Sequence, residues 1–214
     1  MTLQHRLQEY ASPEGAREYL EEYEKAHRKW SDRRERRILE RFFVRTGKVG
    51  SALDLPCGFG RYLGFLREHA GQVAQSDWSG EMMLLSRRLF PEHPVFGQVR
   101  GSGSAMPFRD RAVDLVFSMR LNHHVADPAA RRAHVDEILR VARRFAVFSY
   151  FDAGSLKARI RRWRARSGGK REKNTLARTE VRALAAAAGF VVHADPMLFA
   201  VGSGHRLLLA ERAS

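Results

Sequence analysis

Short apolar runs alternate with longer amphipathic stretches along most of the chain, from about residue 50 to the C-terminus. Each run has the length of a strand, and the stretches between the runs repeat their apolar positions at helical spacing. Seven strands are predicted, at residues 51–55, 72–77, 94–99, 113–119, 145–151, 190–195 and 205–211. Four helices are predicted between them, at residues 61–70, 80–90, 128–142 and 179–188.

This order of elements predicts the fold class. Strands separated by single helices form parallel βαβ units, in which helices cover both faces of one sheet. Only residues 196–204 join the last two strands, which is too short for a helical crossover, so we expect one antiparallel C-terminal strand. The predicted fold is α/β: a doubly wound, Rossmann-like sheet of seven mostly parallel strands.

The segment before the first strand has a helical pattern. Ser31 is a candidate N-cap for a helix that reaches about residue 43. We expect this helix to turn four apolar side chains inward, those of Ile38, Leu39, Phe42 and Phe43. The predicted organisation is an N-terminal helical cap over residues 1–48 and one α/β domain over 49–214, with a basic helical insert at 154–178.

Composition narrows the class of protein. The chain has 214 residues, a length that suits one domain with additions, and 44% of them are apolar, which argues against wholesale disorder. Cys57 is the only cysteine, which excludes an internal disulfide and favours a reducing compartment. No apolar run is long enough for a signal peptide or a membrane span. We therefore expect a cytoplasmic protein, with a peripheral position at the inner membrane surface as an alternative.

The positive charge is concentrated in two segments. The chain has 38 Lys and Arg against 24 Asp and Glu, a net charge of +14, and the excess lies at 28–37 and 156–173. In the second segment Leu156, Ile160 and Trp163 would form one apolar stripe on a helix among cationic residues. This pattern is typical of a helix at a membrane surface or of a lid that holds an anionic ligand. The alternative is a stripe that packs on the sheet while the cations face water.

A glycine-rich turn follows the first strand. This strand ends in D-L-P-C-G-F-G (54–60), where Gly58 and Gly60 let the backbone approach a ligand at the start of a helix. Asp77 ends the second strand and can accept hydrogen bonds from both hydroxyls of a ribose, and Trp78 beside it offers a flat surface. A nucleoside ligand is therefore predicted. The acid at position 54 would repel a pyrophosphate but suits a ligand that carries an ammonium and a sulfonium.

These residues resemble the motifs of a known family. D-L-P-C-G-F-G-R (54–61), S-D-W-S-G-E-M-M (76–83) and the segment from Gly101 to Val125 are similar to motifs of class I S-adenosylmethionine-dependent methyltransferases, of the type 11-like kind. The resemblance covers about residues 50–150. It implies S-adenosylmethionine as cofactor and a methyltransferase domain over 49–214.

The resemblance also implies roles for individual residues. The cofactor-binding residues that it implies are Asp54, Pro56, Gly58, Gly60, Asp77, Trp78, Ser102, Gly103, Ser118 and Met119, with Arg120 next to the last two. Two of them depart from the family pattern. Pro56 stands where many members have a glycine, and Ser102 stands where an aspartate commonly receives the adenine amino group. We therefore expect a modest affinity for the cofactor.

Candidate catalytic groups follow the fourth and fifth strands. His123 and His124 would lie on the rim of the crevice, where either could act as a general base, unless it caps the next helix or is buried. Tyr150 would also point toward the crevice or simply end its strand. We expect no bound metal.

The expected function is methyl transfer from S-adenosylmethionine to a small or lipid- or sugar-linked anionic acceptor, at oxygen. Contact with an anionic membrane is a further expectation from the basic stripe. One alternative is an RNA methyltransferase that holds phosphates with the two basic segments, although the sequence contains no recognised nucleic-acid-binding module. The other alternative is a cofactor-binding scaffold without catalysis.

Overall fold

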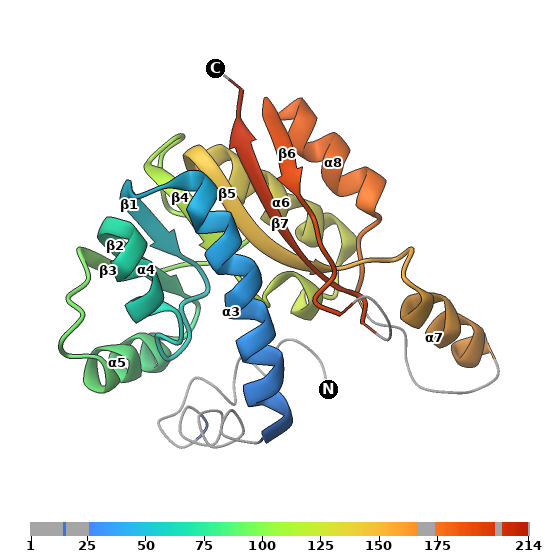
Figure 1. Ribbon diagram of the computed structural model, residues 1–214, viewed down its shortest axis with the longest axis horizontal. Helices are drawn as coiled ribbons and strands as arrows, with labels where there is room; N and C mark the ends of the chain where they lie inside the picture. The colour runs from blue at the N-terminus through green and yellow to red at the C-terminus, as the bar shows by residue number, and fades with distance from the viewer. Residues whose placement is uncertain (1–14, 16–25, 167–173, 200–202, 214) are drawn as a thin grey trace.

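A single seven-stranded sheet forms the centre of the protein (Figure 1). The computed structural model describes residue 15 and residues 26–166, 174–199 and 203–213. The strands are β1 (Val49–Asp54), β2 (Ala70–Asp77), β3 (Gly97–Arg100), β4 (Val113–Ser118), β5 (Ala142–Phe151), β6 (Phe190–Ala194) and β7 (His205–Arg212). Their order in the sheet is β3-β2-β1-β4-β5-β7-β6, and β7 is antiparallel to both of its neighbours. The predicted fold class is confirmed.

Helices cover both faces of the sheet (Figure 1). They are α3 (Ala26–Thr46), α4 (Leu63–His69), α5 (Gly80–Leu89), α6 (Pro128–Val141), α7 (Leu156–Arg166) and α8 (Arg178–Ala187), with a short 3-10 helix, η1 (Asn122–His124). Helices α3 and α4 pack in one apolar cluster, and α6 and α8 pack in the other. The predicted boundaries differ most at α3, which begins at Ala26, so Ser31 lies inside this helix and is not its N-cap. Strand β5 begins three residues early because α6 runs into it without a loop.

Alternation of side chains along each strand builds these two clusters. In β1, Ala52 faces α3 and α4 while Leu53 faces α6 and α8. In β4, Leu115 and Phe117 lie on the first side and Val116 lies on the second. Strands β4, β5 and β7 each contain a run of buried, mostly apolar residues, because both faces of the sheet are covered there, and such runs are the pattern from which the strands were predicted.

The N-terminal helix α3 belongs to the same core as the sheet. Its four predicted inward side chains, Ile38, Leu39, Phe42 and Phe43, are all buried, as expected. The helix runs diagonally across one face of the sheet in Figure 1. Residues 1–14 and 16–25, which complete the predicted cap, lie outside the described residues.

The strand order reverses between β1 and β4. The helix that follows β1 leads back to β2 on one side, whereas β4 lies on the other side of β1. The loops at the carboxyl ends of these strands therefore diverge, and a point of this kind is where open α/β sheets bind ligands. Asp54, Asp77 and Ser118 are the last residues of β1, β2 and β4, so the fold brings three predicted site residues to this edge.

Helix α7 differs from the others because it projects away from the sheet (Figure 1). It occupies the first half of the predicted basic insert, and residues 167–173 lie outside the described part of the chain. Leu156, Ile160 and Trp163 are exposed on it, so the alternative in which this stripe packs on the sheet is wrong. Among the described residues, no helix is long and apolar enough to cross a membrane.

Candidate active site

The turn after β1 and the end of β2 are joined by a direct hydrogen bond. The backbone N–H of Gly58 donates to Oδ2 of Asp77 at 2.8 Å, and the N–H of Cys57 donates to the carbonyl of Ser76 at 3.0 Å. Gly58 and Gly60 have φ values of +52° and +84°, which disfavour any residue with a Cβ. The structure thus brings together the glycine bend and the acid that the sequence predicted to share a ligand.

Asp77 keeps room for further hydrogen bonds. Its Oδ1 accepts from the backbone N–H of Ser79 at 2.9 Å, in addition to the bond from Gly58. Burial raises the pKa of the Asp77 carboxyl, while the N–H groups of Ser79, Gly58 and Trp78 act to lower it. A carboxylate has about four acceptor positions, so with three N–H donors there is still room for at least one ribose hydroxyl.

Asp54 is a buried acid that lacks a partner for one oxygen. Among the described residues, none forms a hydrogen bond to its Oδ2, and the side chain is almost fully buried. Burial, and next the nearby Asp77, raise the pKa of the Asp54 carboxyl well above its usual range, with Arg61 acting against them. A buried carboxylate is costly unless a cation or a proton balances it. The orphaned oxygen therefore fits the ammonium and sulfonium charges of S-adenosylmethionine.

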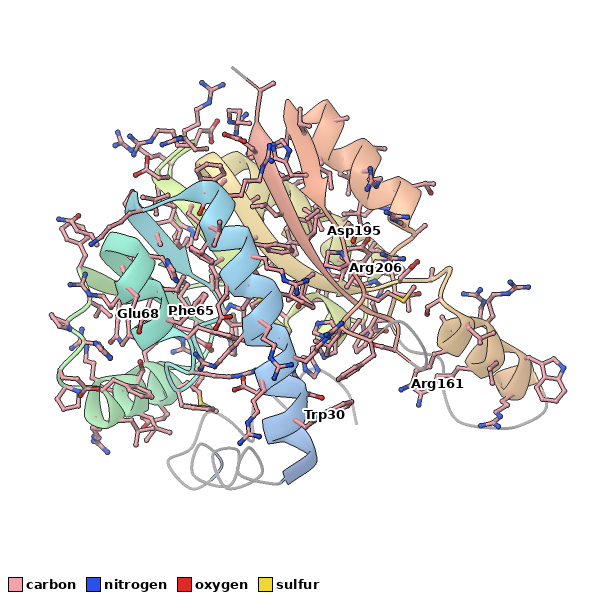
Figure 2. All side chains as sticks on the ribbon, in the orientation of Figure 1. Trp30, Phe65, Glu68, Arg161, Asp195 and Arg206 are labelled. Atoms are coloured by element: carbon pink, nitrogen blue, oxygen red, sulfur yellow. The ribbon has the colours of Figure 1, made fainter. Side chains whose placement is uncertain are left out.

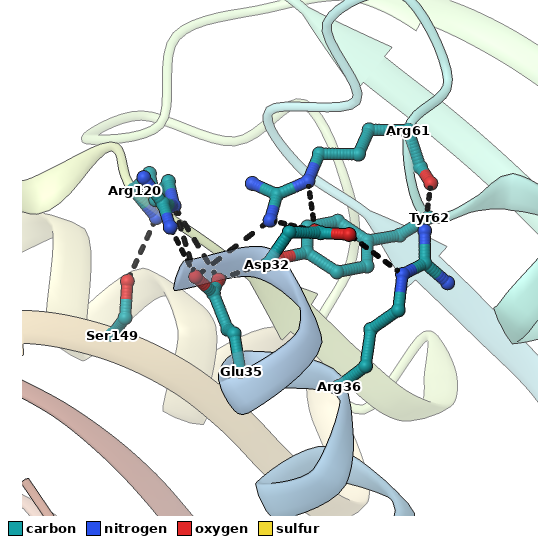
Figure 3. A network of polar contacts seen from close by, with 7 residues as sticks. All are labelled: Asp32, Glu35, Arg36, Arg61, Tyr62, Arg120 and Ser149. Atoms are coloured by element: carbon teal, nitrogen blue, oxygen red, sulfur yellow. Dashed lines mark hydrogen bonds and ion pairs between the residues drawn. The ribbon is translucent and has the colours of Figure 1, made fainter. Parts of the chain in front are cut away.

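A second acid, Glu35 of α3, is fully buried in a network of polar contacts (Figure 3). Arg120 Nε lies 3.1 Å from Glu35 Oε2, Arg61 Nη2 lies 3.7 Å from the same oxygen, and the Tyr62 hydroxyl also donates to Glu35. Burial alone would raise the pKa of Glu35, but Arg120, Arg61 and then His205 lower it to about 2. Glu35 is therefore ionised at neutral pH.

This network links helix α3, the loop after β4 and strand β5 to the glycine bend. Asp32 pairs with Arg61, the residue after Gly60, and Arg36 donates to the carbonyl of Arg61 at 3.0 Å (Figure 3). Arg120, with φ +63°, also donates its N–H to the Ser149 hydroxyl of β5 at 2.7 Å. Sequence reasoning missed Asp32 and Glu35. Their only signal was that they are the sole acids in the basic segment 28–37 and lie three residues apart.

The predicted adenine side of the site is held by His134 of α6. Its Nδ1 lies 2.8 Å from the carbonyl of Gly103, and its Nε2 lies 3.1 Å from the hydroxyl of Ser118. Because a carbonyl only accepts, Nδ1 carries the proton and Ser118 donates to Nε2. Burial lowers the pKa of His134 to about 4, which keeps the ring neutral. The Ser118 hydroxyl is thus engaged with α6, and His134 is a positioning residue that the sequence did not reveal.

The other predicted cofactor residues lie around this edge in different environments. Trp78 is half exposed, and the guanidinium of Arg100 lies 5.6 Å from the centre of its ring. Ser102 Oγ lies 3.1 Å from Ser104 Oγ within its own turn. Met119 is buried in the α3–α4 cluster, and Pro56 lies in the bend after a cis peptide bond.

The two candidate histidines lie in a cluster of rings. His123 and His124 form η1, with ring centroids 4.1 Å apart, and the centroid of Phe151 lies 4.6 Å from that of His123. His205, at the start of β7, lies 5.3 Å from Phe151 and 6.4 Å from His123. We call these four residues the ring cluster. His205 was missed because site residues were expected at the carboxyl ends of strands. Strand β7 is antiparallel, so its first residue, His205, lies at the edge where the parallel strands end.

Tyr150 is placed away from the ring cluster. Its hydroxyl donates to Oδ1 of Asp195 at 3.0 Å, and burial, with Asp195, raises the pKa of Tyr150 far above its usual range. Asp195 also pairs with Arg178 at 2.7 Å, and Figure 2 shows Asp195 beside Arg206. Neighbouring side chains in a strand point to opposite faces, so Phe151 faces the histidines while Tyr150 faces the other way. This placement gives no support to a catalytic role for Tyr150.

A cleft continues from the ring cluster toward α7. It is open to solvent, and its empty space, part of the open solvent included, is about 430 Å³. Its lining residues are Phe151, Asp152, Ser155, Lys157, Ala158, Arg161, Arg162, Thr175 and Gly204. The carboxylate of Asp152 accepts from Arg206 Nε at 2.8 Å, so its charge is already balanced. Three basic residues, Lys157, Arg161 and Arg162, give this wall of the cleft its net positive charge, and Phe151 belongs to both the cleft and the ring cluster.

Comparison with known families agrees with the geometry of the bend. Residues 53–148 match the profile of the family described as "Methyltransferase domain". The matched segment runs from the end of β1 through most of β5 and contains Asp54, both bend glycines, Asp77 and the two histidines. The matched segment is thus similar to methyltransferase domains. The similarity agrees with the buried Asp54 carboxylate at the bend, whose Oδ2 has no hydrogen-bond partner among the described residues.

Solved methyltransferases share the fold at low identity. The magnesium protoporphyrin IX methyltransferase of Synechocystis PCC 6803, with bound SAH, has a TM-score of 0.70 at 14% identity, with 88% of each chain covered. The N-methyltransferase NodS of Bradyrhizobium japonicum WM9, in complex with S-adenosyl-l-homocysteine, has a TM-score of 0.66 at 14% identity, with 89% of this chain and 90% of that chain covered. At these identities the likeness concerns the fold.

One curated protein is similar in sequence. An uncharacterized 37.1 kDa protein in transposon TN4556 of Streptomyces fradiae is 35% identical over 106 residues. The match covers 48% of this chain and 30% of that protein, so this chain spans less than a third of its relative.

Proposed function

We propose that this protein transfers a methyl group from S-adenosylmethionine to an oxygen of an anionic acceptor, either a small molecule or one linked to a lipid or a sugar. Binding of the cofactor is supported by Asp54, which lies near Asp77. Its Oδ2 is buried and has no hydrogen-bond partner among the described residues. The observation that favours an anionic acceptor is the basic wall of the cleft beside Phe151.

The methyltransferase domain contributes binding and alignment. Bound S-adenosylmethionine supplies an electrophilic methyl group, so the reaction is an in-line displacement at that carbon. Asp54 balances the positive charge of the cofactor, Asp77 accepts from its ribose, and the bend at Gly58 admits it close to the backbone. Alignment of this kind can supply about 7–11 kcal/mol of the reduction in barrier.

An oxygen nucleophile needs a base, and the ring cluster offers two. His123 and His124 lie beyond the end of β4, on the same edge as the bend, and their rings are partly exposed. Either imidazole could accept the proton of an acceptor hydroxyl as its oxygen bonds to the methyl carbon and the bond from that carbon to the sulfonium sulfur breaks. Phe151 contacts His123 and lines the cleft, which places the basic wall next to this base.

The proposal is tested by finding the acceptor with methyl-labelled S-adenosylmethionine. The protein is incubated with a cell extract divided into lipid, small-molecule and RNA fractions, and labelled products are identified by mass spectrometry. We expect label on an oxygen of an acidic compound in the first or second fraction. Label in RNA would favour the RNA alternative, and tight cofactor binding without transfer to any fraction would favour the scaffold alternative.

Substitution of the histidines tests the base. With the acceptor in hand, His123→Ala or His124→Ala is expected to lower kcat by about 10²–10⁴-fold, the usual contribution of a general base, with an unchanged Kd for S-adenosylmethionine. His193→Gln serves as the control, because His193 pairs with Glu211 near the far end of β7. A base among these residues is contradicted if both alanine variants keep the parent rate.

A further inference from the structure

Helix α7 is anchored at its N-terminus and extends outward from there. The Ser155 hydroxyl accepts from the N–H of Ala158 at 3.2 Å and donates to the carbonyl of Asp152 at 2.8 Å. Arg162 Nη1 donates to the carbonyl of Ala153 at 2.9 Å. These contacts fix the first two turns against the end of β5, while the helix axis points away from the sheet (Figure 1).

The apolar stripe of α7 lies on its outer face. With 100° per residue, Leu156, Ile160 and Trp163 fall within about 60° of one another. Their side chains are 63%, 42% and 68% exposed. The opposite face is the half-buried one, and Figure 2 shows Arg161 on the side of α7 that faces the rest of the protein. A helix at the surface of a soluble domain normally has the reverse arrangement, with its apolar stripe facing the core.

Cations flank this stripe on both sides. Lys157 and Arg164 lie on one side of it and Arg159 on the other, and all three are exposed. The helix contains six Lys and Arg and no acidic residue. Long basic side chains can reach lipid phosphates while the stripe enters the layer below them, which is how helices bind in the plane of an anionic membrane.

We propose that α7 docks this protein on the surface of an anionic lipid bilayer. The charge of α7 is complementary to such a surface, and each Lys or Arg near it strengthens binding roughly fivefold. The helix is only about 16 Å long and its stripe has three side chains, whereas a stable protein partner needs about 800 Å² of surface. RNA would use the cations and could stack a base on Trp163, but it would leave the outward Leu156 and Ile160 without a role. The inference is independent of the proposed function.

Vesicle co-sedimentation of the full chain tests the inference without any turnover. Phosphatidylcholine vesicles with and without phosphatidylserine are used at low and at physiological salt. We expect binding to the phosphatidylserine vesicles alone, weaker at the higher salt. Trp163→Ala should weaken binding at least about tenfold through lost apolar burial. Arg159→Gln with Arg164→Gln should weaken it by roughly 25-fold.

Phe96→Ala is the matched control. Phe96 is 76% exposed, but it precedes β3, the outermost strand on the side of the sheet away from β6. It should bind vesicles as the parent protein does. All of these positions are exposed, and circular dichroism verifies the fold of each variant. The inference is overturned if phosphatidylserine vesicles do not bind, or if Trp163→Ala and Phe96→Ala behave alike. It is also overturned if tRNA displaces the vesicles and tRNA binding depends on the two arginines but not on Trp163.

Discussion

Gly58 and Gly60 have similar backbone conformations but different surroundings. A Cβ at Gly60 would lie 2.2 Å from Ser86 Oγ and 3.1 Å from the ring of Phe90. A Cβ at Gly58 would meet no atom within 4 Å. Gly60 is therefore needed for the packing of α5 against the bend, whereas the space beside Gly58 is available to a ligand.

The two glycines should respond differently to alanine. Gly60→Ala combines a strained φ with a clash and should lower the free energy of unfolding by about 2–4 kcal/mol. Gly58→Ala carries only the strain and should cost about 1–2 kcal/mol, but should weaken the binding of S-adenosylmethionine. Urea unfolding and cofactor titration measure the two effects. Equal losses of stability would show that the bend is packed differently.

Asp54 should make cofactor binding depend on pH. Its pKa is raised by burial and by Asp77, so lowering the pH protonates it in the free protein. A cationic ligand favours the ionised form, so binding should release protons and the affinity should rise as the pH increases through the raised pKa. Calorimetric titration of S-adenosylmethionine in buffers of different ionisation enthalpy measures this release.

Asp54→Asn tests which group releases the proton. This variant should release fewer protons and bind the cofactor about tenfold more weakly or worse. Asp114→Asn is the matched control, since Asp114 lies near the amino end of β4, at the other edge of the sheet. If Asp54→Asn and the parent protein release the same number of protons, Asp54 is not the group that loses a proton when the cofactor binds.

At the scale of elements, Glu35 joins α3 to the loops after β1 and β4. Its pKa of about 2 lies below the ordinary 4.5, so the ionised form stabilises the fold. That contribution, about 3 kcal/mol, should be present above pH 4.5 and lost as the pH falls toward 2. Acid unfolding of the parent protein should therefore be steeper over this interval than that of Glu35→Gln.

Glu35→Gln should also lower stability at neutral pH, because Arg120 and Arg61 lose their buried counter-charge. We expect a loss of about 2–3 kcal/mol in urea unfolding, less than for a fully buried pair because Arg120 can contact water. Glu40→Gln, at an exposed position of the same helix, should be nearly neutral. Equal stability of the two variants would mean that Glu35 does not hold α3 in place.

At the scale of the whole molecule, the sheet could be predicted because its central strands are buried on both faces. Such strands form apolar runs that stand out between amphipathic helices, as at 113–119 and 145–151. The antiparallel β7 followed from the short connection at 196–204. The position of the bend beside Asp77 followed from the topology, since parallel strands that are neighbours end at the same edge.

Contacts between distant segments could not be predicted. Glu35 meets Arg120 across 85 positions, and nothing local in the sequence pairs them. His134 reaches Ser118 and Gly103 from a helix whose rotation is set by packing. Neighbouring residues of a strand point to opposite faces of the sheet, so an error of one position places a side chain on the wrong face. For this reason Tyr150 was predicted at the place that Phe151 occupies.

The central claim is that the carboxylate of Asp77 at the Gly58 bend holds S-adenosylmethionine. Calorimetric titration of the parent protein and of Asp77→Ala tests it most directly. We predict that the parent protein binds one cofactor, and that Asp77→Ala binds at least about tenfold more weakly because hydrogen bonds to a charged group are lost. A parent protein that does not bind S-adenosylmethionine, or a folded Asp77→Ala variant with the same Kd, would contradict the account.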